Sequence, residues 1–242
     1  MMNLPFIFET LERLIAGIPL TLELATLSVA AGGCIGLCIA LMRLSGRWPL
    51  VAFAWLYVQL MRSTPLLVLL FLIYYGLGQF AAVRNGPLWP VLREPYWCAL
   101  IALSFNSAAY AAEIIRGGLL SVGHKEREAA LACGMSRLLY MRRIMLPLAI
   151  RQALPAYGNE AIAMVKATSL ASLVTLMEIT GIAASIASET YRPIGAFVAA
   201  GALYLAITFL LTRAVKAMEY RLTRHLRPPP TAPAPYRSGA SA

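Results

Sequence analysis

The sequence predicts an all-α protein that crosses a membrane with five transmembrane helices. Hydrophobic residues make up 60% of the 242 residues and charged residues only 13%, whereas soluble domains contain about 45–50% and 25%. The apolar residues gather in long runs, and about 20 such residues are enough for a helix to cross the hydrocarbon core. The basic residues lie mostly between these runs. This chain therefore needs lipid around it.

The first two apolar runs predict one straight span and one bent span. The first run extends from Ile18 to Met42 and contains a single ionisable residue, Glu23. The second run covers about residues 49–80 and is interrupted near its start by the segment Arg62-Ser63-Thr64-Pro65. Because proline lacks a backbone donor, this segment predicts a kink.

Three further spans complete the predicted bundle. The third covers residues 96–115 and opens with Tyr and Trp, which are typical anchors at a membrane surface. The fourth is expected within residues 152–187, with a polar entry, and the fifth within residues 194–217. Residues 121–151 carry too many charges to cross the membrane, so they are predicted to form a loop.

The distribution of Lys and Arg predicts the orientation, because cytoplasmic segments of membrane proteins are rich in these residues. An odd number of spans places the two termini on opposite faces. One predicted face holds 15 of the 21 basic residues, the other holds four, and Arg62 and Lys166 fall inside apolar runs. We therefore expect the N-terminus outside and the C-terminus in the cytoplasm.

Several function classes are not expected. The net charge is +10, but the basic residues flank apolar runs and form no single stripe, which argues against nucleic-acid binding. The cysteines and histidines lack the spacing of a metal site. No P-loop, zinc-protease or nucleophile-elbow motif is present. The chain is therefore predicted to be no enzyme and to bind no cofactor or metal.

The loop between the third and fourth spans carries a spaced pattern, E-A-A, three residues, G, nine residues, I-x-L-P. Residues 126–133 predict a short alanine-rich helix, Gly134 can end it in the left-handed conformation, and Ser136 can cap the next helix. Alanines allow a helix to sit inside a groove of another protein, with basic residues around it. An ordinary helix beside anionic lipid is the alternative. The pattern comprises Glu128, Ala129, Ala130, Gly134, Ile144, Leu146 and Pro147.

This spacing resembles the signature loop by which integral subunits of bacterial ABC importers engage their ATP-binding subunits. RSTPLLVLLFLIYYGL, AAYAAEIIRGGLLSV and ALPAYGNEAIAMVKATSLASLVTLMEITG resemble the polar amino acid permeases, particularly their histidine and opine (octopine, nopaline) branch, from about Gly17 to Glu219. The resemblance implies a type I ABC importer permease fold and a permease domain over residues 1–219, with a docking loop at about 121–147. Composition predicts that the Pro-rich residues 220–242 form a disordered cytoplasmic tail.

The resemblance also implies a location and a set of partners. The chain is expected to be a multi-pass protein of the inner membrane, with ATP and Mg bound by a separate ATP-binding cassette subunit. A periplasmic solute-binding protein and a second permease subunit are the other expected partners, with a heterodimer preferred to a homodimer. Membrane lipid surrounds the assembly.

The sequence departs from the subfamily pattern at specific positions. Ser63 replaces the glycine of RGTPLL, Glu126 stands where glutamine is usual, and Leu148 replaces the glutamine of LPQA. The change at Glu126 lies in the predicted docking loop and could alter how the loop docks on the ATPase subunit. Ala167 replaces the aspartate of KDTSL, which removes a carboxylate that could meet a cationic solute.

Polar groups inside a span are by default candidates for function. Glu160 could meet the ammonium of an amino acid and Lys166 its carboxylate, or the two could pair with each other. Glu113 and Arg116, three residues apart, predict an intrahelical pair. Glu178, near the end of the fourth span, is a further candidate that could also face water. The predicted solute path comprises Ser63, Thr64, Asn106, Asn159, Glu160, Lys166, Thr168 and Ser169.

The predicted function is therefore a permease subunit of an ATP-binding cassette importer for polar amino acids or opines. Two other functions stay open at this point. A proton-coupled secondary carrier could relay protons through Glu113, Glu160 and Lys166 without an ATPase. A membrane scaffold could use the loop only to anchor a cytoplasmic partner.

Overall fold

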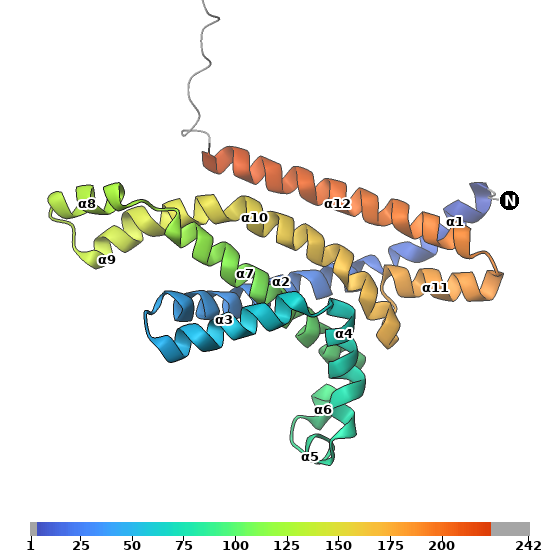
Figure 1. Ribbon diagram of the computed structural model, residues 1–242. Coiled ribbons are helices and arrows are strands. Elements are labelled where there is room, and N and C mark those ends of the chain that lie inside the picture. The colour runs from blue at the N-terminus through green and yellow to red at the C-terminus, as the bar shows by residue number, and fades with distance from the viewer. Residues whose placement is uncertain (1–3, 224–242) are drawn as a thin grey trace, which may run out of the picture.

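The computed structural model describes residues 4–223, and this part of the chain contains helices and turns but no strand. Three helices are long and apolar enough to cross a membrane, namely α2 (Ile18–Leu44), α7 (Pro95–Leu120) and α12 (Pro193–Thr223). Two bent helix pairs raise the number to as many as five if each pair counts as one span. The architecture is thus an all-helical membrane bundle (Figure 1).

Close contact between α2 and α7 forms the centre of the bundle (Figure 1). The contact depends on small residues, because a Cβ atom added at Gly32 would lie 2.8 Å from the Ser107 Cβ, and one added at Gly36 would lie 2.7 Å from the Ala111 Cβ. Small residues allow helix backbones to approach closely in membranes, where van der Waals packing stabilises helix pairs. The two helices therefore pack as one unit, and α10 covers a side of it.

The second predicted span bends where the sequence places a proline. Helix α3 (Trp48–Ser63) ends before Pro65, and the following segment, Leu66–Gln79, turns away by 103°. This confirms the kink. The segment comprises α4 (Leu66–Phe71), a π-helical turn and a 3₁₀ turn, and the short helices α5 (Ala81–Arg84) and α6 (Trp89–Leu92) follow at the extremity of the molecule (Figure 1).

The fourth predicted span is broken, which the sequence did not predict. Helix α10 (Leu146–Ala167) continues as a 3₁₀ helix to Val174, and α11 (Ile179–Thr190) then continues at an angle of 47°. The break contains Thr175 in the left-handed conformation, with φ 68°. No glycine or proline marks this position, so the apolar run reads as continuous.

An N-terminal helix precedes the first span and was also not predicted. Helix α1 (Leu4–Ile15) has twelve residues, too few to span the membrane. Its Leu14 is fully buried in a second hydrophobic core with Ile179 and Ile186 of α11 and Ala199 of α12. Helix α1 therefore holds α11 and α12 together at the end of the molecule opposite α8 (Figure 1).

The last helix is longer than the sequence indicated. Helix α12 continues to Thr223, so residues 220–223, which were assigned to the tail, are helical. Residues 224–242, the rest of the predicted disordered tail, lie outside the described residues.

Candidate docking loop and intramembrane polar residues

The predicted helix and left-handed turn of the loop are both present. Helix α8 (His124–Ala132) ends at a turn in which Gly134 has φ 72°. The Gly134 N–H donates to the Leu131 carbonyl at 2.9 Å, and the Met135 N–H donates to the Ala130 carbonyl at 3.0 Å. These two bonds satisfy carbonyls at the end of the helix and form a Schellman motif.

The second helix of the loop starts with the predicted cap. The Ser136 Oγ accepts a hydrogen bond from the Leu139 N–H at 3.4 Å at the start of α9 (Arg137–Tyr140). A π-helical turn, Met141–Met145, then leads without interruption into α10. The helix-turn-helix is confirmed, and it lies at one end of the bundle, beyond α7 and α10 (Figure 1).

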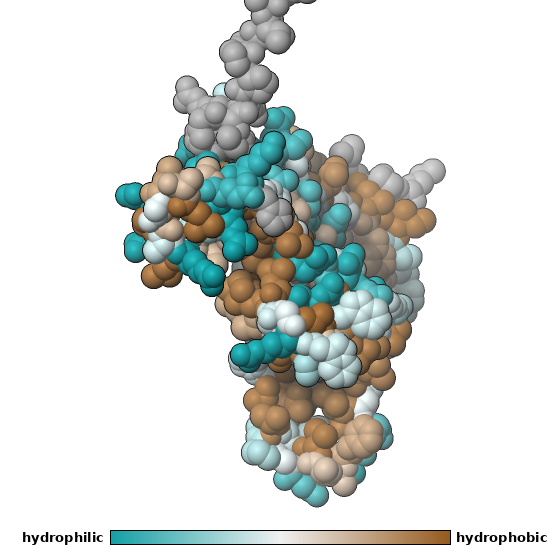
Figure 2. All heavy atoms as spheres, turned by 60° about the vertical axis from the view of Figure 1, so that its left-hand side comes forward, coloured by the Kyte–Doolittle hydropathy of each residue, from teal (hydrophilic) through white to brown (hydrophobic). Residues whose placement is uncertain are grey.

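Most residues of the E-A-A to L-P pattern are accessible in this chain. Figure 2, which brings this end of the molecule forward, shows hydrophilic and hydrophobic side chains side by side around the loop. Glu128, Ala129, Gly134 and Leu146 are exposed, Ile144 and Pro147 are half-buried, and Ala130 is buried.

The departure at Glu126 has a local explanation. Glu126 lies in the first turn of α8, and its carboxylate folds back, since a Cβ added at Gly123 would lie 2.7 Å from the Glu126 Oε2. The start of a helix favours a negative charge because its backbone N–H groups point outward. Glu126 therefore extends toward Gly123 at the start of α8.

Glu113 belongs to an ion cluster that joins two spans. Its Oε2 accepts hydrogen bonds from Arg116 at 2.7 and 3.1 Å, which confirms the intrahelical pair. Its Oε1 also lies 3.3 Å from the Arg43 Nη1 of α2, a contact that the sequence did not predict. The cluster ties α2 to α7 near the start of the loop, and a carboxylate held by two guanidinium groups is poorly suited to carry protons.

Part of the predicted solute path gathers where α3 meets α7. The buried Asn106 donates from its Nδ2 to the Met61 carbonyl of α3 at 3.4 Å. Thr64 caps the end of α3 and donates from its hydroxyl to the Leu60 carbonyl at 2.8 Å. Ser63 is exposed beside it. Asn106 thus contacts the last turn of α3, the turn that Ser63 and Thr64 end.

The residues predicted on α10 lie on different faces of that helix. Glu160 is half-buried and lies beside Ser107 of α7, whose buried Oγ has no hydrogen-bond partner among the described residues. Lys166 is exposed and makes no ion pair within residues 4–223, so the mutual pair with Glu160 does not form. The hydroxyls of Thr168 and Ser169 donate to backbone carbonyls, each at 2.7 Å.

Helix α10 presents an exposed stripe that runs along the membrane-spanning part of the molecule. Its members are spaced by alternating steps of four and three residues, which places them on one helical face. Polar residues in the stripe recur every seventh position, with alanines between them. The α10 stripe consists of Gln152, Ala156, Asn159, Ala163 and Lys166, all exposed.

Glu178 is a buried polar centre between α11 and α12. A position facing water was one of the readings left open, but its side chain is fully buried. It accepts hydrogen bonds from the backbone N–H groups of Thr180 and Gly181, each at 2.9 Å, and from the Tyr204 hydroxyl of α12 at 2.6 Å. Glu178 therefore caps α11 and binds it to α12. In the sequence, only the polar residues around the break hint at this role of Glu178.

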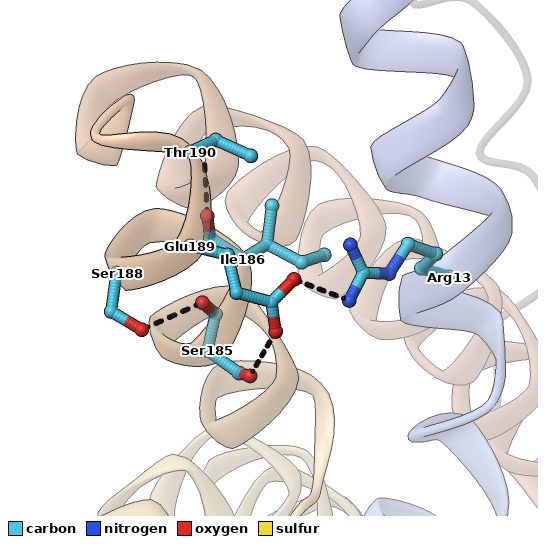
Figure 3. Close-up of polar contacts among 6 residues, drawn as sticks. All are labelled: Arg13, Ser185, Ile186, Ser188, Glu189 and Thr190. Atoms are coloured by element: carbon cyan, nitrogen blue, oxygen red, sulfur yellow. Dashed lines mark hydrogen bonds and ion pairs between the residues drawn. The ribbon is translucent and has the colours of Figure 1, made fainter.

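The opposite end of the bundle is joined by an exposed ion pair. Figure 3 shows Arg13 of α1 reaching across to Glu189 of α11, at 3.0 Å from Nη2 to Oε2. The Ser185 hydroxyl donates to the other carboxylate oxygen of Glu189 at 2.9 Å (Figure 3). Both partners of the pair are about half exposed, so it orients α1 without burying charge.

The sequence and the fold are both similar to those of known transport proteins. The octopine transport system permease protein of Rhizobium meliloti is 56% identical over 217 residues, covering 90% of this chain and 89% of the relative. The nopaline transport system permease protein of Agrobacterium fabrum is 50% identical over 227 residues, covering 93% and 94%. A crystal structure of an amino acid ABC transporter with histidines has a TM-score of 0.81 and 36% identity, covering 91% of this chain and 99% of that chain.

A family match covers most of the permease domain. Residues 32–224 match the family described as binding-protein-dependent transport system inner membrane component. Members of this family are transport subunits of ABC importers, whose ATPase is a separate subunit. This excludes the proton-coupled secondary carrier and the scaffold as functions of this chain. The chain belongs to the family of inner membrane components of binding-protein-dependent transport systems.

Proposed function

We propose that this subunit carries an opine of the octopine or nopaline type, or a polar amino acid, across the inner membrane. The names of the octopine and nopaline permeases, at 56% and 50% identity, support this solute class. In this proposal each bent helix pair is one span, which gives five spans. The N-terminus then lies outside and the C-terminus in the cytoplasm, as the basic residues favour.

The α10 stripe is the observation that carries the proposal. Asn159 and Lys166 are exposed in this single chain, although they lie within a candidate span. A cation or an amide facing lipid is unfavourable, so polar groups at this depth face a water-filled path or another protein. We therefore assign the α10 stripe to the wall of a translocation path that a second permease subunit completes. A heterodimer is preferred on the basis of the resemblance to the histidine and opine branch.

The solute contacts follow from the positions of the charges. Lys166 has no acidic partner within residues 4–223 and is free to meet a carboxylate of the solute. Glu160 lies on another face, beside Ser107, and would meet an ammonium group. Ser63, Thr64 and Asn106 would add polar contacts from the α3 and α7 side.

The loop supplies the link to ATP in this proposal. The exposed Glu128, Ala129 and Gly134 would enter a groove of the ATP-binding cassette subunit, which holds ATP and Mg. Closure of the ATPase subunits would move the loop, and through α7 and α10 the bundle, between inward-open and outward-open states. A periplasmic solute-binding protein would deliver the solute at the end that carries α1 and α11.

Cysteine accessibility tests the assignment of the α10 stripe. Ala163→Cys, in a chain whose native cysteines are replaced, should react with a hydrophilic maleimide in membrane vesicles, because the stripe faces water. Ala206→Cys is the matched control, since Ala206 is exposed on α12 and would face lipid. We expect Ala163→Cys to react about tenfold faster, and solute to slow it. Equal rates at both positions would remove the α10 stripe from the path.

Glu160→Gln tests the solute contact. The replacement keeps the size of the side chain and removes its charge, so a charge-assisted bond to an ammonium group is lost. Such bonds contribute about 1.5–3 kcal/mol, which predicts a roughly tenfold or greater rise in the solute concentration for half-maximal uptake. Copurification should show that assembly with the ATPase subunits is unchanged. Unaltered uptake of octopine, nopaline, arginine and histidine would remove Glu160 from the site.

A further inference from the structure

A groove lies between the end of α7 and the helices of the loop. It has a volume of about 390 Å³ and is lined mostly by apolar side chains, among them Leu119 and Leu120 of α7 and Met141 and Met145 of the π-helical turn. Leu120 and Met141 are exposed to the groove and its mouth, at 58% and 42%. Apolar groups left open in this way indicate a surface that something else covers.

Two arginines give this groove its charge. Arg127 of α8 and Arg137 of α9 line it from the side of the loop, and both are exposed. Neither arginine makes a salt bridge with another described residue. The one acidic side chain known to lie at the rim is Glu126, whose carboxylate folds against Gly123 of the lining. The groove therefore combines an apolar floor with a net positive rim.

The position of this groove matches the level of lipid headgroups. Leu120 is the last residue of one candidate span, and Arg137 is the first residue of the bent helix pair that forms another. The groove therefore lies where two candidate spans end, with Arg137 at the end of one of them and Arg127 in the loop between them. Guanidinium groups bind phosphate through paired hydrogen bonds, and basic residues next to a span attract anionic lipid.

We propose that this groove binds one anionic phospholipid, with its phosphate between Arg127 and Arg137 and its glycerol and upper acyl carbons on the apolar floor. The exposed docking residues Glu128, Ala129 and Gly134 are not part of the lining, so lipid and ATPase use different faces of the loop. The lipid would fill the space between the loop and α7 and make the loop move with the bundle. This inference does not depend on the identity of the solute.

Native mass spectrometry of the delipidated transporter in detergent tests the site. Phosphatidylglycerol or phosphatidylcholine is added at matched concentrations, and the bound lipid is counted. We expect preferential binding of phosphatidylglycerol, weakened about 25-fold when Arg127→Ala and Arg137→Ala are combined, because each basic residue near the surface contributes roughly fivefold. Glu126→Gln should strengthen binding, since it removes the negative charge at the rim.

Arg142→Ala combined with Arg143→Ala is the matched control. These arginines belong to the same loop and are exposed, but they do not line the groove. The control should bind phosphatidylglycerol within about twofold of the wild type. The proposal is wrong if both double variants lose binding equally, if phosphatidylcholine binds as well, or if the full chain binds the lipid only without the ATPase subunits. The last result would mean that an ATPase side chain fills the groove.

Discussion

Gly134→Asp is expected to reduce solute-stimulated ATP hydrolysis by the assembled transporter about tenfold or more. Gly134 has φ 72°, a conformation that costs a residue with a side chain roughly 1–2 kcal/mol. Nothing lies within 4 Å of a Cβ added there, so no clash inside this chain contributes. The strain would shift α9 relative to α8, and the new carboxylate would project from the surface that we propose meets the ATPase subunit.

The chain contains a matched control for this substitution. Gly46, between α2 and α3, has φ 70°, and a Cβ added there also meets nothing within 4 Å. Gly46→Asp therefore adds the same strain and the same charge outside the loop. ATP hydrolysis and copurification with the ATPase subunits should stay near wild type in Gly46→Asp. Equal losses in both variants would indicate a general effect of strain and count against docking through Gly134.

The features that the sequence predicted correctly are those with local causes. Apolar length determines a span, and the first, third and fifth predicted spans correspond to α2, α7 and α12, which are longer by two, six and seven residues. The bend after Ser63 follows from Pro65 alone. The turn at Gly134 and the cap at Ser136 also depend on neighbouring residues only. Each of these signals lies within a few residues of its effect.

The features that the sequence did not predict depend on contacts with residues that lie far away along the chain. Helix α1 is shorter than a span and gains its stability by burying Leu14 against α11 and α12, so its own composition indicates little. The break before α11 rests on α2: a Cβ added at Gly17 would lie 2.6 Å from the Ile179 backbone nitrogen, and the Thr21 hydroxyl accepts from that nitrogen at 3.4 Å. Only the folded chain brings these residues together.

For the same reason, the sequence indicates only part of how the candidate solute-path residues lie in the fold. The spacing of Asn159 and Lys166, seven residues apart, shows that they share a helical face, but not that this face is exposed. Glu160 and Ser107 belong to different helices, and their proximity follows from the packing of α10 on α7. In a membrane both sides of a helix are apolar, so hydrophobic periodicity does not show which side faces lipid and which side faces protein.

Among the substitutions considered, Glu178→Gln is expected to cause the largest loss of stability, because Glu178 binds α11 to α12. Glu178→Gln keeps the shape of the side chain, but one acceptor oxygen becomes an amide donor that faces another donor. The carboxyl group accepts from Thr180, Gly181 and Tyr204, and a glutamine cannot satisfy all three. A buried donor left without an acceptor costs about 1–3 kcal/mol. We therefore expect the thermal unfolding midpoint in detergent to fall by roughly 4–8 °C.

Two further variants show whether the loss of stability in Glu178→Gln comes from its buried hydrogen bonds or from losing any carboxylate. Glu189→Gln removes a carboxylate from the same helix, but its partner Arg13 is about half exposed (Figure 3), and water replaces a broken surface pair, so the midpoint should change little. Tyr204→Phe removes one of the three bonds to Glu178 and leaves the cap of α11, so its midpoint should lie between those of Glu178→Gln and the wild type. If Glu178→Gln is as stable as Glu189→Gln, the buried carboxyl group does not hold α11 to α12, and the break in the fourth span must be maintained by the packing of Gly17 against Ile179.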